Sequence, residues 1–486
     1  MQGIALEHAS GRPLARTVVR LEPVPKPGSA LKPLSVRAAL TGHFIFPAVE
    51  PGIYILTAAH PGYFPVSYGQ RLPIGHGAPI EVTADSSLFA ELRLRHKGAI
   101  TGRILDENGV GTVGVDVVAY RARLPLRSVA NGASDDRGVF RIFGLEPGKY
   151  WVRTAPHTMD DNTGWLPTYA TQARETREAR TYQVTVDADT TDADVIPEPG
   201  SLVRLAGIVT CDRTLPASAL VVLSSETGRR SMETSCPAGS YQFQGLAPGP
   251  YEMFAVMPDG ASAAFAEFYL DRNSTAGNVQ LMPLPTVNFE IVRSGTNAAV
   301  DIPVTVLGRR PDLAESGSAR EIPLRTTLPP GNWEFRANVP TGQYVESIAS
   351  VRTPPRRVSR PERPADWFDV FIEQRSFTRI RIAVSDQAGQ IAGVVKTAGN
   401  TVPGVPVFLW PLAESVRRSL GGPLQTISGT DGQFRFDSLP PGRYRVLASF
   451  DVNEIDEDIL ELSQAPETHA EASELTRVEL PLWTAP

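Results

Sequence analysis

Residues 432–436 read GQFRF and residues 439–444 read LPPGRY, and this pair of motifs decides the fold. In the first motif two phenylalanines alternate with polar residues, which is the period-two pattern of a strand with one apolar face. In the second motif the Pro-Gly pair predicts a type II turn, because proline fixes φ and glycine accepts a positive φ. Apolar alternation resumes at Tyr444. The pair therefore predicts a hairpin whose apolar side needs a second sheet to cover it.

The same pair of motifs recurs along the chain. Both motifs return within residues 42–54, 138–150 and 239–251, and the turn motif alone returns in residues 328–333. The turn glycines lie about 97 residues apart on average and are Gly52, Gly148, Gly249, Gly331 and Gly442. This spacing is the length of a small domain and is too long for a solenoid repeat. Positive φ is expected most clearly at Gly148, Gly249 and Gly442.

A second pattern precedes most copies and completes the predicted domain. Residues 100–104 (ITGRI) are followed by the apolar residues 113–117, and residues 391–395 and 405–409 repeat the arrangement. We interpret these segments as strand pairs joined by turns. About seven strands in each repeat are typical of a small antiparallel β-sandwich, so the predicted fold is all-β. The predicted domains are residues 1–95, 96–198, 199–285, 286–385 (a degenerate copy) and 386–486, with a short helical segment expected only within 454–462.

Composition excludes several classes of function. The chain has 486 residues, a net charge of −6, 41 glycines and 43 prolines. A chain so near neutrality has no basic surface for nucleic acid or for an anionic membrane. No apolar run reaches the ~18 residues that suggest a membrane-spanning helix. Neither a nucleic-acid partner nor a membrane span is therefore expected.

Together the two patterns resemble the carboxypeptidase regulatory-like domain, a transthyretin-like β-sandwich related to Cna-B adhesin domains and to starch-binding folds. The matching motifs are Val/Ile-x-Gly-x-Val, Gly-x-Phe-x-Phe and Leu-x-Pro-Gly-x-Tyr, and they recur over nearly all of the chain. The resemblance implies a bacterial exported protein built of non-catalytic modules for attachment, adhesion or sugar binding. It implies no peptidase activity, because in metallocarboxypeptidases this domain is a non-catalytic attachment.

No motif points to catalysis, to a metal or to a cofactor, and none of these is predicted. The seven histidines lie apart, and none stands in a His-Glu-x-x-His setting. The acidic residues within 187–194 and 451–458 have spacings that Ca²⁺ could use. Neither cluster has the glycine and the final glutamate of an EF-hand loop, so solvated loops are the favoured interpretation.

Aromatic residues in two loops are the candidate ligand-binding residues. These rings follow the first and second copies of the motif and are Tyr63, Phe64, Tyr68, Trp165 and Tyr169. Exposed rings with polar rims could stack on sugars. The alternative is that the rings pack against their own sandwich or fill the joint to the next one. Burial of the rings decides between the two.

Cys211 and Cys236 are the only cysteines of the chain, and both fall in the third predicted domain. This placement favours a disulfide over two buried thiols. Closing the 25-residue span would contribute about 3 kcal/mol of stability.

The sequence therefore predicts a non-enzymatic binding or scaffold protein of the cell envelope or exterior, with carbohydrate or an envelope protein as its partner. The alternative is an accessory region of a larger peptidase or outer-membrane receptor system. Residues 2–8 show neither a basic nor an apolar leader, so no signal peptide is recognised. Export, to the periplasm, cell surface or medium, is expected from the resemblance, and a truncated N-terminus stays open.

Overall fold

The computed structural model describes residues 1–26, 28–73, 75–84, 88–122, 126, 128–160, 162–212, 217–225, 228–310, 319–351, 366–374 and 377–485. Within these residues the fold is almost entirely β, and its sheets form five successive β-sandwiches. Each sandwich surrounds its own cluster of buried apolar side chains. The all-β prediction is correct, whereas the exact domain boundaries stay a prediction.

The first sandwich packs a sheet ordered β4-β1-β8 against a sheet ordered β3-β2-β5-β6, and β7 also pairs with β5. Its strands are β1 (Gln2–Glu7), β2 (Val18–Pro23), β3 (Leu34–Arg37), β4 (His43–Ile45), β5 (Gly52–Ala59), β6 (Val66–Ser67), β7 (Ile80–Val82) and β8 (Phe89–Leu94).

The second sandwich consists of the sheets β11-β10-β13-β16 and β12-β9-β17, and strands β14 and β15, which lie between β13 and β16 in the chain, pair with β18 in a small third sheet. Its strands are β9 (Gly98–Arg103), β10 (Asp116–Arg121), β11 (Ser128–Ala133), β12 (Val139–Leu145), β13 (Gly148–Thr154), β14 (His157–Thr158), β15 (Thr163–Trp165), β16 (Tyr182–Val184), β17 (Asp189–Thr190) and β18 (Pro199–Ser201).

In the third sandwich the two layers join into one sheet, ordered β21-β20-β23-β24-β25-β19-β22. The strands are β19 (Val203–Cys211), β20 (Ala217–Ser225), β21 (Gly228–Cys236), β22 (Ala238–Leu246), β23 (Gly249–Val256), β24 (Ser262–Leu270) and β25 (Val279–Pro283).

The fourth sandwich packs the sheets β29-β26-β33-β31 and β28-β27-β30-β32. Its strands are β26 (Thr286–Arg293), β27 (Thr305–Arg309), β28 (Arg320–Ile322), β29 (Arg325–Thr327), β30 (Gly331–Asn338), β31 (Tyr344–Ser350), β32 (Phe368–Ile372) and β33 (Phe377–Ser385).

The fifth sandwich packs β35-β34-β38, with β41 on β34, against β37-β36-β39-β40. Its elements are β34 (Gly389–Thr397), β35 (Asn400–Thr401), β36 (Pro406–Pro411), α1 (Glu414–Leu420), β37 (Leu424–Ile427), β38 (Gln433–Leu439), β39 (Gly442–Ala448), α2 (Glu457–Leu462), β40 (Glu467–Ala470) and β41 (Leu475–Pro481). Helix α2 lies within the segment where the sequence suggested one, and α1 was not anticipated. Neither described helix is long and apolar enough to cross a membrane.

The Phe-x-Phe strand and the strand after the Pro-Gly motif do not form the expected hairpin. Strand β38 pairs with β34, whereas β39 pairs with β36 in the opposite sheet. In the second sandwich β12 pairs with β9 and β13 with β10 in the same way. The Pro-Gly segment therefore crosses from one layer to the other. The strand pairs predicted for residues 100–117 and 391–409 are wrong for the same reason, because their two strands also lie in opposite sheets.

The aromatic residue of the motif anchors this crossing by a hydrogen bond to the backbone. In every sandwich its ring N–H or O–H donates to the carbonyl of the fourth residue before it. The pairs are Tyr54 with Glu50 (2.8 Å), Tyr150 with Glu146 (2.8 Å), Tyr251 with Ala247 (2.7 Å), Trp333 with Pro329 (2.9 Å) and Tyr444 with Pro440 (2.6 Å). This is the geometry of a tyrosine corner, and it explains why the worn fourth copy still carries an aromatic donor.

The turn glycines do not adopt type II geometry. The φ angles are 145° at Gly148, 150° at Gly249, 121° at Gly331 and 159° at Gly442, against about +80° for that turn. Gly52 lies outside the positive-φ region. Each glycine is the first residue of the strand after the crossing. The segment is thus a link between layers and not a turn within one sheet.

The first and last strands of each sandwich run parallel, which the antiparallel prediction did not include. The parallel pairs are β1 with β8, β9 with β17, β19 with β25, β26 with β33 and β34 with β41. Both ends of each repeat therefore lie in one sheet.

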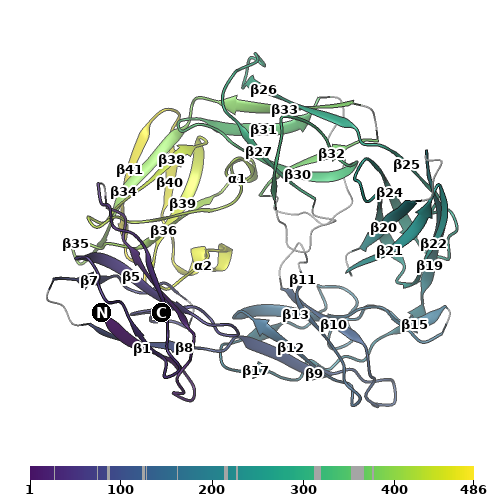
Figure 1. Ribbon diagram of the computed structural model, residues 1–486, viewed down its shortest axis with the longest axis horizontal. Helices are drawn as coiled ribbons and strands as arrows, with labels where there is room; N and C mark the ends of the chain where they lie inside the picture. The colour runs from purple at the N-terminus through teal and green to yellow at the C-terminus, as the bar shows by residue number, and fades with distance from the viewer. Residues whose placement is uncertain are drawn as a thin grey trace.

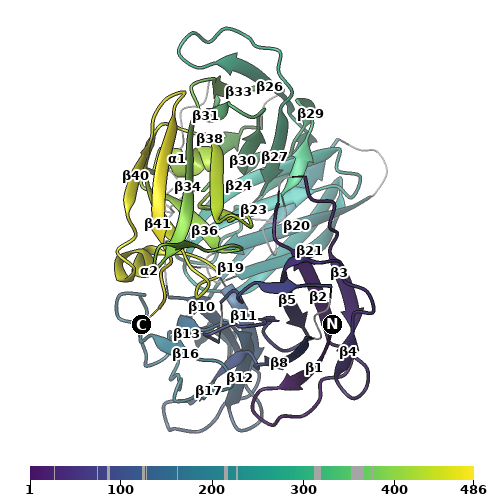
Figure 2. The same ribbon diagram turned by 90° about the vertical axis from the view of Figure 1, so that its left-hand side faces the viewer.

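The sandwiches are arranged as a ring. Figure 1 shows them in chain order around a common centre, with the first (purple) beside the fifth (yellow). Figure 2, turned by 90°, also shows these two next to each other. The chain thus returns to its start through non-covalent contact.

Candidate functional site

The first two sandwiches meet at a buried carboxylate, that of Glu7 at the end of β1. Its Oε1 accepts from the Tyr63 hydroxyl at 3.1 Å and lies 2.6 Å from Nε2 of His96, and Ser10 donates to Oε2. These hydrogen bonds, first that of Ser10 and then that of His96, lower the pKa of Glu7 to about 2. The Tyr63 and His96 rings lie 4.1 Å apart. The cluster joins residues from both sides of the predicted boundary at 95/96.

Asp187 forms the second half of this joint. Its carboxylate accepts from the backbone N–H of His96 at 2.6 Å and from Nη1 of Arg95 at 3.1 Å. Asp189 and Asp194 of the same acidic cluster pair with Arg141 and Arg103. These carboxylates therefore serve packing and pairing with arginine. Among the described residues, no group of three or more His, Cys, Asp or Glu side chains is placed to hold a metal ion.

The aromatic candidates are mostly buried, as the packing alternative requires. Tyr63 is 8% exposed, Phe64 6%, Trp165 7% and Tyr169 2%, and Tyr68 is half-buried. Trp165 belongs to the core cluster of the second sandwich, and the Arg153 guanidinium lies 4.9 Å from the Tyr169 ring. The rings follow the packing alternative, because a ring that fills a core has no free face for a sugar.

The first and fifth sandwiches form the closing joint of the ring. The backbone N–H of His76 donates to the carbonyl of Phe450 at 2.6 Å, and that of Thr430 donates to the carbonyl of Pro25 at 3.3 Å. The buried carboxylate of Asp451 accepts from Nη1 of Arg71 at 3.4 Å. The same carboxylate accepts from the backbone N–H of Ala485 at 2.9 Å. Asp451, one of the acidic residues considered for Ca²⁺, thus holds two distant parts of the chain together.

The closing joint also contains a half-buried imidazole and a glycine without room for a side chain. The His76 ring lies 6.5 Å from the Phe408 ring, and its Nε2 is buried with no hydrogen-bond partner among the described residues. Burial lowers the pKa of His76 from its ordinary value of 6.5. A Cβ on Gly75 would lie 2.8 Å from the carbonyl oxygen of Phe450. The two surfaces therefore meet closely.

The other joints are also built from specific contacts. Asn273 donates to Asn162 at 3.2 Å between the second and third sandwiches, and Asn332 donates to Glu252 at 3.2 Å between the third and fourth. Between the fourth and fifth, the backbone N–H of Gly342 donates to the Ser438 hydroxyl at 2.9 Å.

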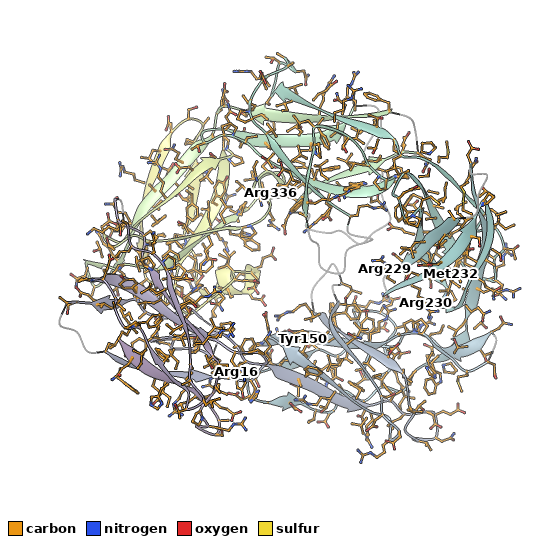
Figure 3. The ribbon with its side chains drawn as sticks, in the orientation of Figure 1. Arg16, Tyr150, Arg229, Arg230, Met232 and Arg336 are labelled. Carbon is orange, nitrogen blue, oxygen red and sulfur yellow. A yellow bond between two sulfur atoms is a disulfide. The ribbon has the colours of Figure 1, made fainter. Side chains whose placement is uncertain are left out.

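Arg336 of β30 belongs to the fourth joint and lies toward the inner side of the ring in Figure 3, as do Arg229 and Tyr150. A Cβ on Gly421, which caps α1, would lie 2.7 Å from Nη1 of Arg336. Burial lowers the pKa of Arg336 from its ordinary value. The arginine is therefore packed between two sandwiches.

Cys211 of β19 and Cys236 of β21 are joined by a disulfide, with their Cα atoms 5.9 Å apart. Cys236 is fully buried in the core cluster of the third sandwich. The bond links the last residue of β19 to the last residue of β21. Its oxidation state in the cell stays a prediction.

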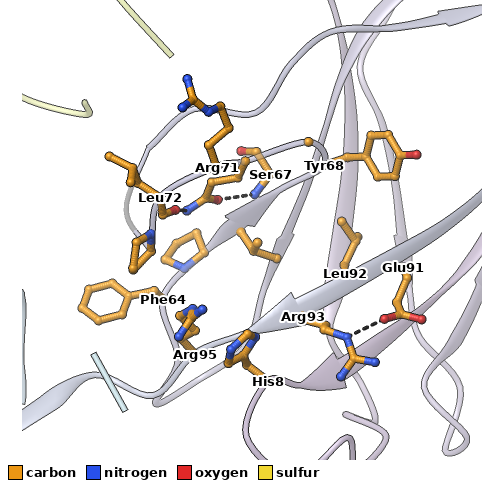
Figure 4. Close-up of a pocket in the computed structure, with 15 residues that line it drawn as sticks. His8, Phe64, Ser67, Tyr68, Arg71, Leu72, Glu91, Leu92, Arg93 and Arg95 are labelled. Atoms are coloured by element: carbon orange, nitrogen blue, oxygen red, sulfur yellow. Dashed lines mark hydrogen bonds and ion pairs between the residues drawn. The ribbon is translucent and has the colours of Figure 1, made fainter. Parts of the chain in front are cut away.

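One pocket opens on the first sandwich, and we call it the β8 pocket. It has a volume of about 210 Å³ and is lined by residues 64–73, by residues 91–93 and Arg95, and by His8. Figure 4 shows His8, Arg93 and Arg95 on its β8 side and Leu72 on the facing loop. Phe64 and Tyr68, two of the aromatic candidates, contribute to this lining. The basic residues were not predicted, although Arg93 in β8 and Arg95 just after it alternate with buried leucines.

A second pocket, of about 330 Å³, lies between the third and fourth sandwiches. Phe265 and Phe371 form its apolar wall, with ring centroids 5.7 Å apart. Gln374 also lines this pocket and donates to the carbonyl of Ala263 at 2.9 Å.

No protein-family model matches the chain, and no curated protein matches it. Solved structures with local similarity include the TIE protein of Bacillus anthracis, at 10% identity over 82% of this chain and 75% of that chain, with a TM-score of 0.17. The minor pilin of Streptococcus agalactiae is 12% identical over 40% and 94%, with a TM-score of 0.25. The RrgB pilus protein of Streptococcus pneumoniae is 8% identical over 80% and 98%, with a TM-score of 0.15. Similarity at this level carries no functional argument.

Proposed function

We propose that the protein is a non-enzymatic scaffold of the cell envelope or exterior, built from carboxypeptidase regulatory-like modules, and that its partner is another protein. The closed ring of five sandwiches is the observation that supports a scaffold role. Contacts between named side chains hold each sandwich against the next, and the Asp451 carboxylate joins the last to the first. A set of sandwiches fixed in this way presents its surfaces in a constant arrangement, which suits simultaneous contact with a large partner.

The cysteine pair supports the export part of the proposal. Cys211 and Cys236 are bonded, and the chain has no other cysteine. Structural disulfides persist in oxidising compartments and are rare in the cytosol. The bond would contribute about 3 kcal/mol to the third sandwich, which is a reason for its retention outside the cell.

A protein partner is favoured over a carbohydrate because of the buried aromatic rings. Sugar binding requires exposed ring faces, and the four most buried candidates, Tyr63, Phe64, Trp165 and Tyr169, are between 2% and 8% exposed. Protein recognition does not depend on these rings.

Two experiments test the proposal. First, cells that produce the full chain are acid-quenched and alkylated under denaturing conditions, and the protein mass is measured before and after reduction. We expect alkylation of both cysteines only after reduction; alkylation before reduction would overturn export. Second, photo-crosslinking in intact cells compares the wild type with Gly75→Val, which we expect to open the ring. We expect one protein partner that only the closed ring captures, whereas glycan-array binding without any protein partner would contradict the proposal.

A further inference from the structure

We propose that the β8 pocket binds a carboxylate group, presented by a small organic acid or by the C-terminus of a polypeptide. The inference rests on the pocket alone and does not depend on the cellular compartment or on the scaffold role.

The pocket is preformed. The backbone N–H of Ser67 donates to Oε1 of Gln70 at 2.9 Å, and Nε2 of Gln70 donates to the carbonyl of Leu72 at 2.8 Å. The N–H of Phe64 donates to the carbonyl of Arg95 at 2.9 Å, which fastens the loop to the end of β8. The loop is therefore ordered before a ligand binds, so binding costs little conformational entropy.

The charge of the lining favours an anion. Among the lining residues, Arg71, Arg93 and Arg95 are positively charged and Glu91 is negatively charged, while Arg71 and Arg95 also pair with Asp451 and Asp187 outside the lining. Glu91 is already engaged, because its Oε1 accepts from Nε of Arg93 at 2.5 Å. A guanidinium carries five N–H donors, so this one bond leaves Arg93 with further donors for a ligand.

The basic groups are also accessible. The Arg93 side chain is 43% exposed, that of Arg95 32% and that of Arg71 58%. Arg95 forms an ion pair with Asp187 at 3.1 Å, and Arg71 forms an ion pair with Asp451 at 3.4 Å. These ion pairs position the guanidinium groups at the rim without enclosing them.

The remaining lining selects the kind of anion. The half-buried Leu72 supplies apolar surface beside the arginines, which suits a ligand with a carbon skeleton. Guanidinium groups bind carboxylates through paired N–H···O bonds. A volume of about 210 Å³ is below the range of drug-sized ligand sites, so it fits one small acid or one chain end.

The test measures binding of matched acids and amides to the full chain by isothermal titration calorimetry. The small-molecule arm compares benzoate with benzamide, its neutral isostere. The polypeptide arm compares a Gly-Gly-Leu tripeptide with a free C-terminal carboxylate and the same peptide with a C-terminal amide. We expect the acid of one or both pairs to bind at least about tenfold more tightly than its amide, and binding to weaken as salt is raised. The pair with the tighter acid identifies the source of the carboxylate.

The decisive variant is Arg93→Gln, whose side-chain partner in the described structure is Glu91 on the surface. We expect about tenfold weaker binding of the acid, the loss typical of one charge-assisted hydrogen bond. Arg272→Gln is the matched control, because Arg272 is 88% exposed on the third sandwich, and its affinity should equal that of the wild type. Thermal melting of both variants verifies that the first sandwich is folded. Equal affinity for acid and amide in both arms, or wild-type affinity in a folded Arg93→Gln, would overturn the proposal.

Discussion

The joint between the first and second sandwiches and the closing joint between the first and fifth differ in how the chain supports them. At the first joint, the chain passes directly from one sandwich to the next between Arg95 and His96, and the bonds of these two residues to Asp187 span 92 and 91 residues of sequence. At the closing joint, Arg71 and Asp451 are 380 residues apart in sequence. A short connection keeps its two partners at high effective concentration, whereas a distant contact must offset the entropy of a long loop. The closing joint is therefore expected to be the weak point of the ring.

The largest effect is expected from a larger side chain introduced into the closing joint. In Gly75→Val the new side chain would begin 2.8 Å from the Phe450 carbonyl oxygen, and backbone cannot move aside as a flexible side chain can. The overpacking should cost roughly 1–3 kcal/mol and separate the first sandwich from the fifth. Small-angle X-ray scattering should then show a larger radius of gyration. Ala78→Val, at a nearby exposed position, is the control, and an unchanged scattering profile for Gly75→Val would show that the ring does not depend on this contact.

Removal of the buried charge of Asp451 should weaken the same joint less than Gly75→Val does. Asp451→Asn preserves the shape of the side chain but weakens its bonds to Arg71 and to the Ala485 amide, at a cost of roughly 1–2 kcal/mol. Hydrogen exchange at the backbone amides of His76 and Thr430 should accelerate. Asp458→Asn, on the exposed face of α2, should leave both rates unchanged. Equal rates in the two variants would mean that Asp451 does not hold the joint.

The closing joint should weaken in mild acid. Because burial lowers the pKa of His76 below 6.5, the neutral ring is favoured in the closed ring, while an exposed His76 binds a proton more readily. The effect is absent above pH 6.5, and stability of the joint falls as the pH drops below that value. Scattering between pH 7.5 and 5 should show progressive opening, which His76→Gln should reduce. Identical pH profiles for the two proteins would exclude His76 as the cause.

The first joint should stay intact at lower pH than the closing joint. Its dependence on pH near neutrality should therefore be the smallest of these effects. Glu7 has a pKa of about 2 in the folded protein against an ordinary 4.5, so its contribution is complete above pH 4.5 and is lost between pH 4.5 and about 2. Glu7→Gln should remove this segment of the acid-unfolding curve, as followed by tyrosine fluorescence. Glu91→Gln, on the outer face of β8, is the control. Superimposable curves for Glu7→Gln and wild type would contradict the assignment.

Local patterns predicted the strands well and their partners poorly. The burial of Phe434 and Phe436 on one face follows directly from their period of two. The hairpin predicted at Gly442 was wrong, because a Pro-Gly pair can stand either in a turn within one sheet or in a crossing between two sheets. The hydrogen bond from Tyr444 to the Pro440 carbonyl distinguishes the two, and it becomes visible only when the chain is folded.

The candidate site shows the same division. Phe64 and Tyr68, which the sequence singled out as candidates, are among the residues that line the β8 pocket. Sequence reasoning could not foresee that Arg93 in β8 and Arg95 just after it contribute charge to a pocket beside the loop of Phe64 and Tyr68. Aromatic residues alone do not reveal exposure, because the same ring suits a core and a surface platform.

Residue spacing within about a hundred positions was enough to predict the repeat and the all-β fold, and it favoured pairing of the two cysteines. Tertiary structure alone decided which strands share a sheet, which aromatic rings are buried and that the fifth sandwich meets the first. Contacts such as Arg71 with Asp451 join residues outside the repeated motifs, so no periodic pattern marks them. Their formation depends on the summed angles of the intervening joints, and those angles arise from side chains that pack only in the folded ring.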